Sequence, residues 1–275
     1  MQQNEILDNY FKQNNFLVTK ENINLCDIKT FAEIRTNGFG ASDASVLLEV
    51  NKYKTLTELI KEKAEKISDP TISEKACVRM GSSLEPYILT NTKLILDQID
   101  QKKYDIIKPK NMYGKDHLNI NYDGVLLDWE NNIITTMEAK TISIYGGKNY
   151  DFTKSIININ LNGSNKFDLG TETLKELTDK FMLNFYKNKK IFNNTIEKLK
   201  YYANECGVPI YYYPQVQQQL MAFDDTVKYG YLTALNTKTW SLHIFVIPRD
   251  FEIQKEIEQK AEETWNMITA RKNLI

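Results

Sequence analysis

Apolar and β-branched residues gather in two short runs near the middle of the chain, at 121–127 and 133–140. A polar stretch of turn-forming residues, 128–132, separates them. This pattern predicts a β-hairpin. Because side chains alternate across a strand, we expect Glu138 and Lys140 to point to one face of the second strand.

Helical spacing of apolar residues predicts further elements on both sides of this hairpin. An amphipathic helix is expected at about 55–66, beginning at Thr55. A second is expected to begin at Ser82, whose side chain and that of Glu85 fit a capping box. A long amphipathic helix is expected to close the chain from about Asp250.

A second hairpin is predicted from the runs 228–235 and 240–247, joined by a polar turn. The last run is almost continuously apolar, which indicates a strand buried on both faces. Helices therefore precede, separate and follow strands. This order predicts a mixed α/β (α+β) fold with a central mixed sheet flanked by helices.

The stretch 146–205 is rich in asparagine and lysine. We expect it to form an inserted subdomain rather than part of the sheet, with a helical segment at roughly 171–200. The polar residues 1–30 predict a helical extension. The remainder, 31–275, is expected to be a single domain.

Composition narrows the class of protein. The chain has 275 residues, 42% hydrophobic and 26% charged, with a net charge of −1, as in an ordinary globular protein. No apolar run approaches the roughly 20 residues that span a bilayer, so we expect a cytoplasmic protein without membrane contact. Three separated cysteines, Cys26, Cys77 and Cys206, argue against disulfide frameworks and four-cysteine metal sites. With two histidines, a metal site would rely on oxygen ligands, which suit magnesium, manganese or calcium.

The first hairpin also carries candidate chemistry. Asp123 begins the first strand and can lie close to Glu138 in a folded sheet. Two carboxylates with Lys140 beside them would suit a divalent cation. The alternative is a cross-strand ion pair on an exposed face, worth under about 1 kcal/mol.

A glycine-rich turn, Gly38 and Gly40, leads into Ser42, a good N-cap residue. The helix that follows would present free N–H groups and a positive dipole end, which suits an anion. Arg35 just upstream can add a bidentate phosphate contact. The alternative is a helix start that contacts only water.

A short helix is predicted within 209–223 from apolar residues at i, i+4 and i+7. Three glutamines, Gln215, Gln218 and Gln219, lie off this apolar stripe. We expect them near its border or facing outward, where they could reach DNA or simply form a polar face.

Four segments resemble, in order, the motifs of the YqaJ-type viral recombinases, the phage lambda exonuclease family. That family has R-x-x-G-[IF]-G-[AG]-S-D-A, G-x-x-L-E-P, a PD-(D/E)xK core and Y-x-Q-V-Q. The corresponding segments here are RTNGFGASDA at 35–44, GSSLEP at 81–86, DG at 123–124 with EAK at 138–140, and YPQVQ at 213–217.

The resemblance implies a PD-(D/E)xK restriction-endonuclease-like core. By carry-over, a Mg²⁺ ion, for which Mn²⁺ can substitute, would be held by Glu85, Asp123, Glu138 and the carbonyl of Ala139. Lys140 would orient or deprotonate the attacking water. The catalytic residues implied are thus Glu85, Asp123, Glu138 and Lys140.

The same resemblance implies that Arg35 and Ser42 bind a 5′-terminal phosphate and that Gln215 contacts the DNA backbone. It implies 5′→3′ degradation of one strand of linear duplex DNA. The 3′-tailed product would suit a single-strand annealing protein as partner, and family members can form trimers. Two departures are the long polar stretch 146–205, which could reshape a trimer interface, and residues 1–30, which match no family motif.

Two other functions remain open from the sequence. A PD-(D/E)xK endonuclease of the restriction or repair type would keep the same core but cut internally. A nuclease-derived DNA-binding protein would have no turnover, although the presence of Asp123, Glu138 and Lys140 argues against it.

Overall fold

The structure is a computed structural model, and it describes residues 2–23, 33–67, 75–142, 146–162 and 170–273. Its centre is a six-stranded mixed sheet with the strand order β3-β6-β7-β9-β10-β8. Only the β7–β9 pair among these is parallel. The strands are β3 (Asp105–Ile107), β6 (Gly124–Leu127), β7 (Ile133–Ile142), β8 (Ile157–Asn160), β9 (Tyr229–Asn236) and β10 (Ser241–Pro248).

Both predicted hairpins are confirmed. In the first, β6 pairs with β7 so that Gly124 lies opposite Met137. In the second, β9 pairs with β10 along their full lengths. Every residue of β10 is buried, as its continuous apolar character predicted.

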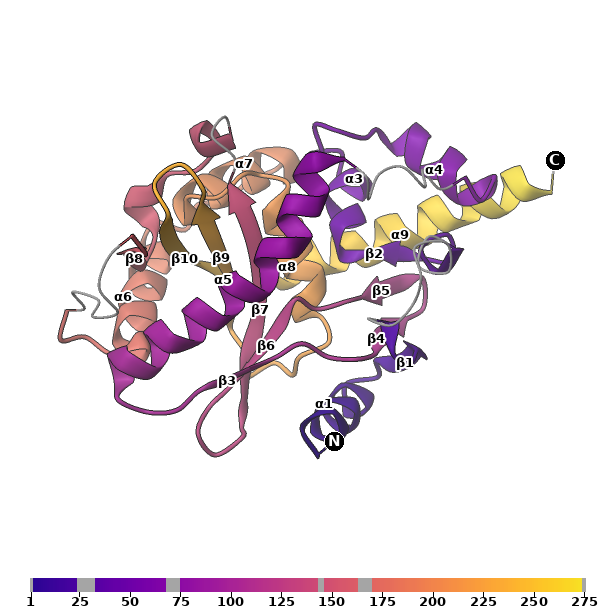
Figure 1. Ribbon diagram of the computed structural model, residues 1–275. Helices are drawn as coiled ribbons and strands as arrows, with labels where there is room; N and C mark the ends of the chain where they lie inside the picture. The colour runs from indigo at the N-terminus through magenta and orange to yellow at the C-terminus, as the bar shows by residue number, and fades with distance from the viewer. Residues whose placement is uncertain (1, 24–32, 68–74, 143–145, 163–169, 274–275) are drawn as a thin grey trace.

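Helices cover both faces of the sheet (Figure 1). On one face, α5 (Ala76–Asp100) and α6 (Leu174–Lys187) share a core with Met137 and Ala139. On the other face lie α7 (Thr195–Cys206) and α8 (Tyr212–Leu220), and α9 (Phe251–Lys272) packs against α8. The mixed α/β class predicted from the order of elements is confirmed.

A second, four-stranded sheet has the order β1-β4-β5-β2. Its strands are β1 (Leu17–Lys20), β2 (Phe39–Gly40), β4 (Met112–Lys115) and β5 (Leu118–Ile120). The helix expected near the N-terminus is present as α1 (Gln2–Gln13). Its Phe11 is fully buried and stacks on Tyr122 with ring centroids 5.1 Å apart. The first residues thus share a core with the strand that leads to Asp123.

The helix predicted to begin at Thr55 is α4 (Leu56–Ala64), and Thr55 is its N-cap. Short 3₁₀ turns η4 (Gly146–Asn149) and η5 (Phe152–Lys154) precede β8. Within the described residues, no helix has the length and apolar character needed to cross a membrane.

The predicted start of the helix around Glu85 is wrong. α5 begins at Ala76, nine residues before Glu85, and Pro86 lies in its interior. Its first turn is exposed, so water can satisfy the free N–H groups there and no capping side chain is required. Glu85 is therefore a mid-helix residue, not a cap.

The prediction that 146–205 lies outside the sheet is also wrong in one part. β8 pairs with β10 at the sheet edge. Ile157 and Ile159 are buried, whereas Asn158 and Asn160 are exposed. This is the alternation of a half-buried strand, and the asparagine-rich composition masked it.

Candidate active site

Strand β7 brings Glu138 and Lys140 to one face of the central sheet. The Lys140 ammonium donates a hydrogen bond to the Glu138 carboxylate. The Glu138 side chain is 2% exposed, whereas Lys140 remains 21% exposed. The prediction that these two side chains share one face of the strand is confirmed, and that face lies under α8 rather than open to solvent.

Asp123 stands at the start of β6, beside the same pair. One of its carboxylate oxygens accepts a hydrogen bond from the backbone N–H of Ala139 at 3.0 Å. Burial and the neighbouring charge of Glu138 raise the pKa of Asp123 to about 8, although Lys140 acts in the opposite direction. The Glu138 carboxylate is therefore close enough to oppose ionisation of Asp123.

Lys140 is held in its charged form. Burial lowers the pKa of this lysine, but the charges of Glu138 and Asp123 outweigh burial and raise it above its usual value. The ammonium also lies over the Tyr212 ring, 5.1 Å from its centroid. In this arrangement Lys140 is a cation, and its use as a base would require a lower pKa.

Two glutamines of α8 hold the Glu138 carboxylate. The Gln215 side-chain amide donates to one oxygen, and that of Gln219 donates to the other at 2.5 Å. Thr136, also on β7, donates to the Gln219 side-chain carbonyl at 3.2 Å. The expectation that Gln219 faces outward is wrong, because it is fully buried. Gln215 and Gln219 lie one helical turn apart, and that i, i+4 spacing was the signal in the sequence.

Glu85 approaches this cluster from α5, and its charge contributes to the raised pKa of Asp123. Its carboxylate, however, pairs with the Lys108 ammonium at 2.5 Å. In the part of the chain that the structure describes, no three Asp, Glu, His or Cys side chains are grouped to hold a metal ion. The structure thus brings together Asp123 and Glu138, and Glu85 is engaged elsewhere.

The donor chemistry nevertheless fits a hard cation. Asp123 and Glu138 supply only oxygen atoms, which are the ligands that magnesium and manganese prefer. Burial and the adjacent Glu138 raise the pKa of Asp123, and a divalent cation beside these oxygens would favour the charged carboxylate.

A second cluster forms around Arg35. Its guanidinium lies 3.1 Å from the Ser42 hydroxyl and 3.5 Å from Asp43. The Arg35 side chain is 39% exposed, whereas Asp43 is 4% exposed. The sequence-predicted pair Arg35 and Ser42 is therefore brought together, with an exposed cation at its edge.

The predicted N-cap role of Ser42 is wrong. Ser42 lies inside the 3₁₀ turn η2 (Ala41–Asp43), and the helix that follows, α3 (Ala44–Leu47), has four residues. The Asp43 carboxylate accepts the N–H of Gly40 at 3.1 Å, so Asp43 closes the turn. The Ser42 hydroxyl consequently faces Arg35.

Lys63 is the residue of this cluster that motif matching does not reveal. It is fully buried, and its ammonium donates to Asp43 at 2.9 Å and to the carbonyl of Arg35 at 2.5 Å. Burial acts to raise the pKa of Asp43, but Lys63 and Arg35 outweigh it and lower that pKa. A lysine on the apolar stripe of 55–66 was the signal for a buried ion pair.

Helix α8 links the two clusters. Gln218, which we expected to face outward, is also fully buried. Its side-chain amide donates to the carbonyl oxygens of Phe39 at 2.9 Å and Asn119 at 3.1 Å. One helix therefore holds Glu138 through two glutamines and the turn before Ser42 through a third.

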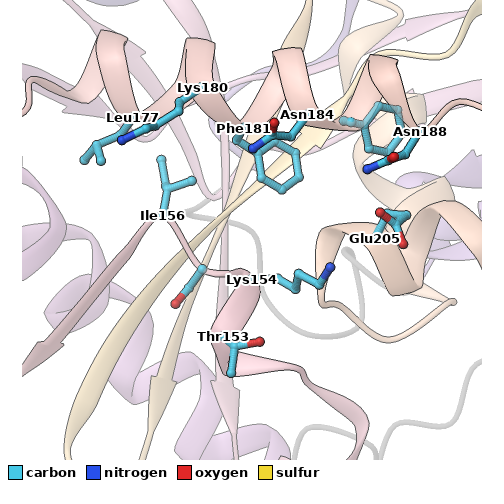
Figure 2. Close-up of a pocket in the computed structure, with 11 residues that line it drawn as sticks. Thr153, Lys154, Ile156, Leu177, Lys180, Phe181, Asn184, Asn188 and Glu205 are labelled. Atoms are coloured by element: carbon cyan, nitrogen blue, oxygen red, sulfur yellow. The ribbon is translucent and has the colours of Figure 1, made fainter.

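A cavity of about 500 Å³ lies away from both clusters, between α6 and the segment before β8. Figure 2 shows Leu177 and Phe181 on the α6 side and Thr153 and Lys154 opposite. None of its lining residues belongs to either cluster. Cys77 and Cys206 are free thiols, and Cys26 lies outside the described residues.

A sequence model described as the YqaJ-like viral recombinase domain matches residues 30–225. These residues include the Arg35 cluster, both carboxylates and the glutamines of α8. No curated protein matches the sequence.

Solved structures with a similar arrangement include an alkaline exonuclease, LHK-Exo, from Laribacter hongkongensis. It shares 12% identity at a TM-score of 0.46, covering 87% of this chain and 92% of its own. The same protein in complex with dAMP has 12% identity and a TM-score of 0.47, covering 89% and 94% of the two chains. Likeness at this level says nothing about individual residues.

Proposed function

The chain belongs to the YqaJ-like viral recombinase domain family, and we propose that it is a Mg²⁺-dependent exonuclease that degrades linear double-stranded DNA 5′→3′. The observation that carries the proposal is the grouping of Asp123, Glu138 and Lys140 beside β7, where two carboxyl groups face a single lysine ammonium.

Asp123 and Glu138 would hold the metal, with the carbonyl of Ala139 as a further oxygen ligand. Glu85 would join them on exchanging its ion pair with Lys108. Once bound, the divalent ion neutralises charge on the phosphate and lowers the pKa of a coordinated water. Gln215 and Gln219 keep both Glu138 oxygens fixed, which preorganises the site.

Lys140 contributes charge. As an ammonium it attracts the phosphate of the scissile bond and orients the attacking water through its N–H groups. Its contact with Glu138 and its position over Tyr212 restrict where that charge can lie.

The direction of degradation would come from the Arg35 cluster. An exposed guanidinium beside a hydroxyl, backed by the buried Asp43–Lys63 pair, suits a terminal phosphate. Holding a 5′-phosphate there would restrict cutting to the end of a strand. The product, duplex DNA with 3′ single-stranded tails, would serve recombination by strand annealing with an annealing protein, and the enzyme can act as a homo-oligomer such as a trimer.

Three DNA substrates test the proposal with purified protein and Mg²⁺: linear duplex with 5′-phosphates, the same duplex with 5′-hydroxyls, and covalently closed circles. We expect rapid loss of the first, slower loss of the second and no change in the third, and EDTA should stop all degradation. Cutting of closed circles would instead establish an endonuclease. Binding without cleavage at any Mg²⁺ or Mn²⁺ concentration would establish a protein without turnover.

A further inference from the structure

A row of tyrosines leads away from Lys140 along the surface. Tyr212, whose ring faces the Lys140 ammonium, packs edge-on against Tyr211 with centroids 4.6 Å apart. Tyr211 in turn packs edge-on against Tyr53 at 5.7 Å. The Lys52 ammonium lies 4.8 Å from the Tyr53 centroid and 5.3 Å from that of Tyr211. We call Tyr212, Tyr211, Tyr53 and Lys52 the tyrosine strip.

Tyr53 is exposed to solvent. Its side chain is 73% exposed. The loop that carries it is nonetheless well fixed, because the side-chain oxygen of Asn51 accepts the N–H groups of Tyr53 at 2.8 Å and Lys54 at 3.0 Å. The Asn51 amide also donates to the Ser45 hydroxyl at 2.8 Å. An aromatic ring held in water by a rigid loop loses little conformational entropy when a ligand stacks on it.

A cavity of about 270 Å³ adjoins the strip at Tyr211. It is small beside the roughly 300–1,000 Å³ of drug-sized ligand sites, so it suits one flat ring. Its apolar wall carries amide and ammonium groups that can meet base edges and phosphates. Its lining includes Lys52, Asn149, Lys200, Asn204 and Tyr211.

We propose that the tyrosine strip and this cavity bind the unpaired nucleotides of the DNA strand that runs to Lys140. Tyr53 and Tyr211 stack on bases, and Lys52 and Lys200 contact the backbone phosphates. A base exposes both faces for stacking only after it leaves the duplex, so the site is specific for single-stranded character rather than for sequence. The inference rests on the proposed nuclease function, because it identifies the form in which DNA reaches that site.

Affinity for single-stranded DNA gives the first test. The probe is a fluorescein-labelled oligo-dT, measured by fluorescence anisotropy in EDTA so that it is not cut. Base–aromatic stacking is strong enough that Tyr53→Ala should weaken binding roughly tenfold, with Tyr53→Trp retaining it. Lys52→Ala should also reduce the salt dependence of binding, by about one phosphate contact. The matched control is Tyr186→Ala, an exposed tyrosine on α6 that is 47% exposed, which should bind as the wild type does.

A small substrate separates this inference from the catalytic one. The p-nitrophenyl ester of thymidine 5′-monophosphate has one base and cannot reach along the strip. For Tyr53→Ala, the rise in KM on oligo-dT should exceed any rise on the ester by roughly tenfold. Equal losses on both substrates, or oligo-dT binding at the wild-type level, would overturn the proposal. If the wild type degrades neither linear duplex nor oligo-dT with Mg²⁺, the nuclease function is wrong, while the anisotropy comparison still decides whether the strip binds single strands.

Discussion

Asp43 and Asp123 are two aspartates in one protein with opposite acid–base behaviour. Each lies beside a lysine ammonium, and burial acts to raise the pKa of both. Asp43 lies between Lys63 and Arg35, and its pKa is lowered. Asp123 shares its surroundings with Glu138 and with Glu85, and its pKa rises to about 8.

The difference lies in the sign of the uncompensated charge. Around Asp43 two cations face one carboxylate, so the cluster retains positive charge for an anion. Around Asp123 and Glu138 one lysine faces two carboxyl groups, so that cluster favours a cation, beside which both carboxyl groups can be ionised. The proposed metal-dependent nuclease would use both, because its substrate is an anion and its cofactor would be a cation.

The largest effect is expected from disabling only the cluster of Asp123, Glu138 and Lys140. Glu138→Ala or Lys140→Ala should reduce cleavage of linear duplex by about 10³-fold or more, because each removes a charge next to the reacting phosphate. DNA binding should change little, since the Arg35 cluster is untouched. Gel-based cleavage and anisotropy on the same preparations measure the two effects, with Lys115→Ala as the surface control. Cleavage by Lys140→Ala at the wild-type rate would refute the catalytic assignment.

The next largest effect is expected on the stability of the protein, through the buried Asp43–Lys63 pair of the Arg35 cluster. Lys63→Met removes a fully buried cation and leaves Asp43 with Arg35, 3.5 Å away, as its remaining cationic partner. Breaking one side of a buried pair typically costs about 3–5 kcal/mol, to be measured as the free energy of unfolding in urea. Lys54→Met, which breaks the more exposed pair with Glu62, should cost under about 1 kcal/mol. Equal losses would mean that Lys63 is not a structural cation.

Arg35→Ala removes only the exposed cation of the Arg35 cluster. Loss of one charge-assisted contact should reduce the preference for 5′-phosphorylated over 5′-hydroxyl ends by about 10- to 100-fold. Rates on the two ends give the preference, and Arg35→Lys should retain part of it. The idea fails if both ends slow equally, since Arg35 would then act on catalysis or folding in general.

The smallest effect concerns the pH dependence of the metal-free protein. Because the folded-state pKa of Asp123 is raised to about 8, its contribution to stability is present below the unfolded pKa near 4 and is lost as pH rises through 8. Asp123→Asn removes this loss. Its melting temperature in EDTA should exceed that of the wild type by a few degrees at pH 9 and by less at pH 5, although cleavage is abolished. A constant difference from pH 5 to 9 would show that Asp123 does not titrate in this range.

Much of this arrangement could be predicted from the chain itself. Apolar and β-branched runs on either side of polar turns located both hairpins, and the alternation of side chains along a strand placed Glu138 and Lys140 on one face. Apolar spacing located α4 and α9. Motif order brought Arg35 together with Ser42. These predictions succeeded because they depend on local sequence pattern, which secondary structure follows directly.

The failures share a different physical cause. β8 was missed because asparagines on its exposed face outweighed two isoleucines in the reading of composition. Gln218 and Gln219 were expected near the border of the apolar stripe or facing outward, because they lie off its helical spacing. Each is buried here because its amide finds a partner on another element. Partners that are distant in sequence leave no local pattern. The ion pair between Lys108 and Glu85 could not be predicted for the same reason.

Helix α8 touches the turn that would hold a strand's terminus and the carboxylate beside which that strand would be cut. Because both points contact this one helix, α8 sets the distance between them. The number of nucleotides between terminus and scission would then be constant, and each turnover would release a fragment of uniform size. Inserting or deleting one residue in α8 would change that number of nucleotides before it affected the cleavage reaction itself.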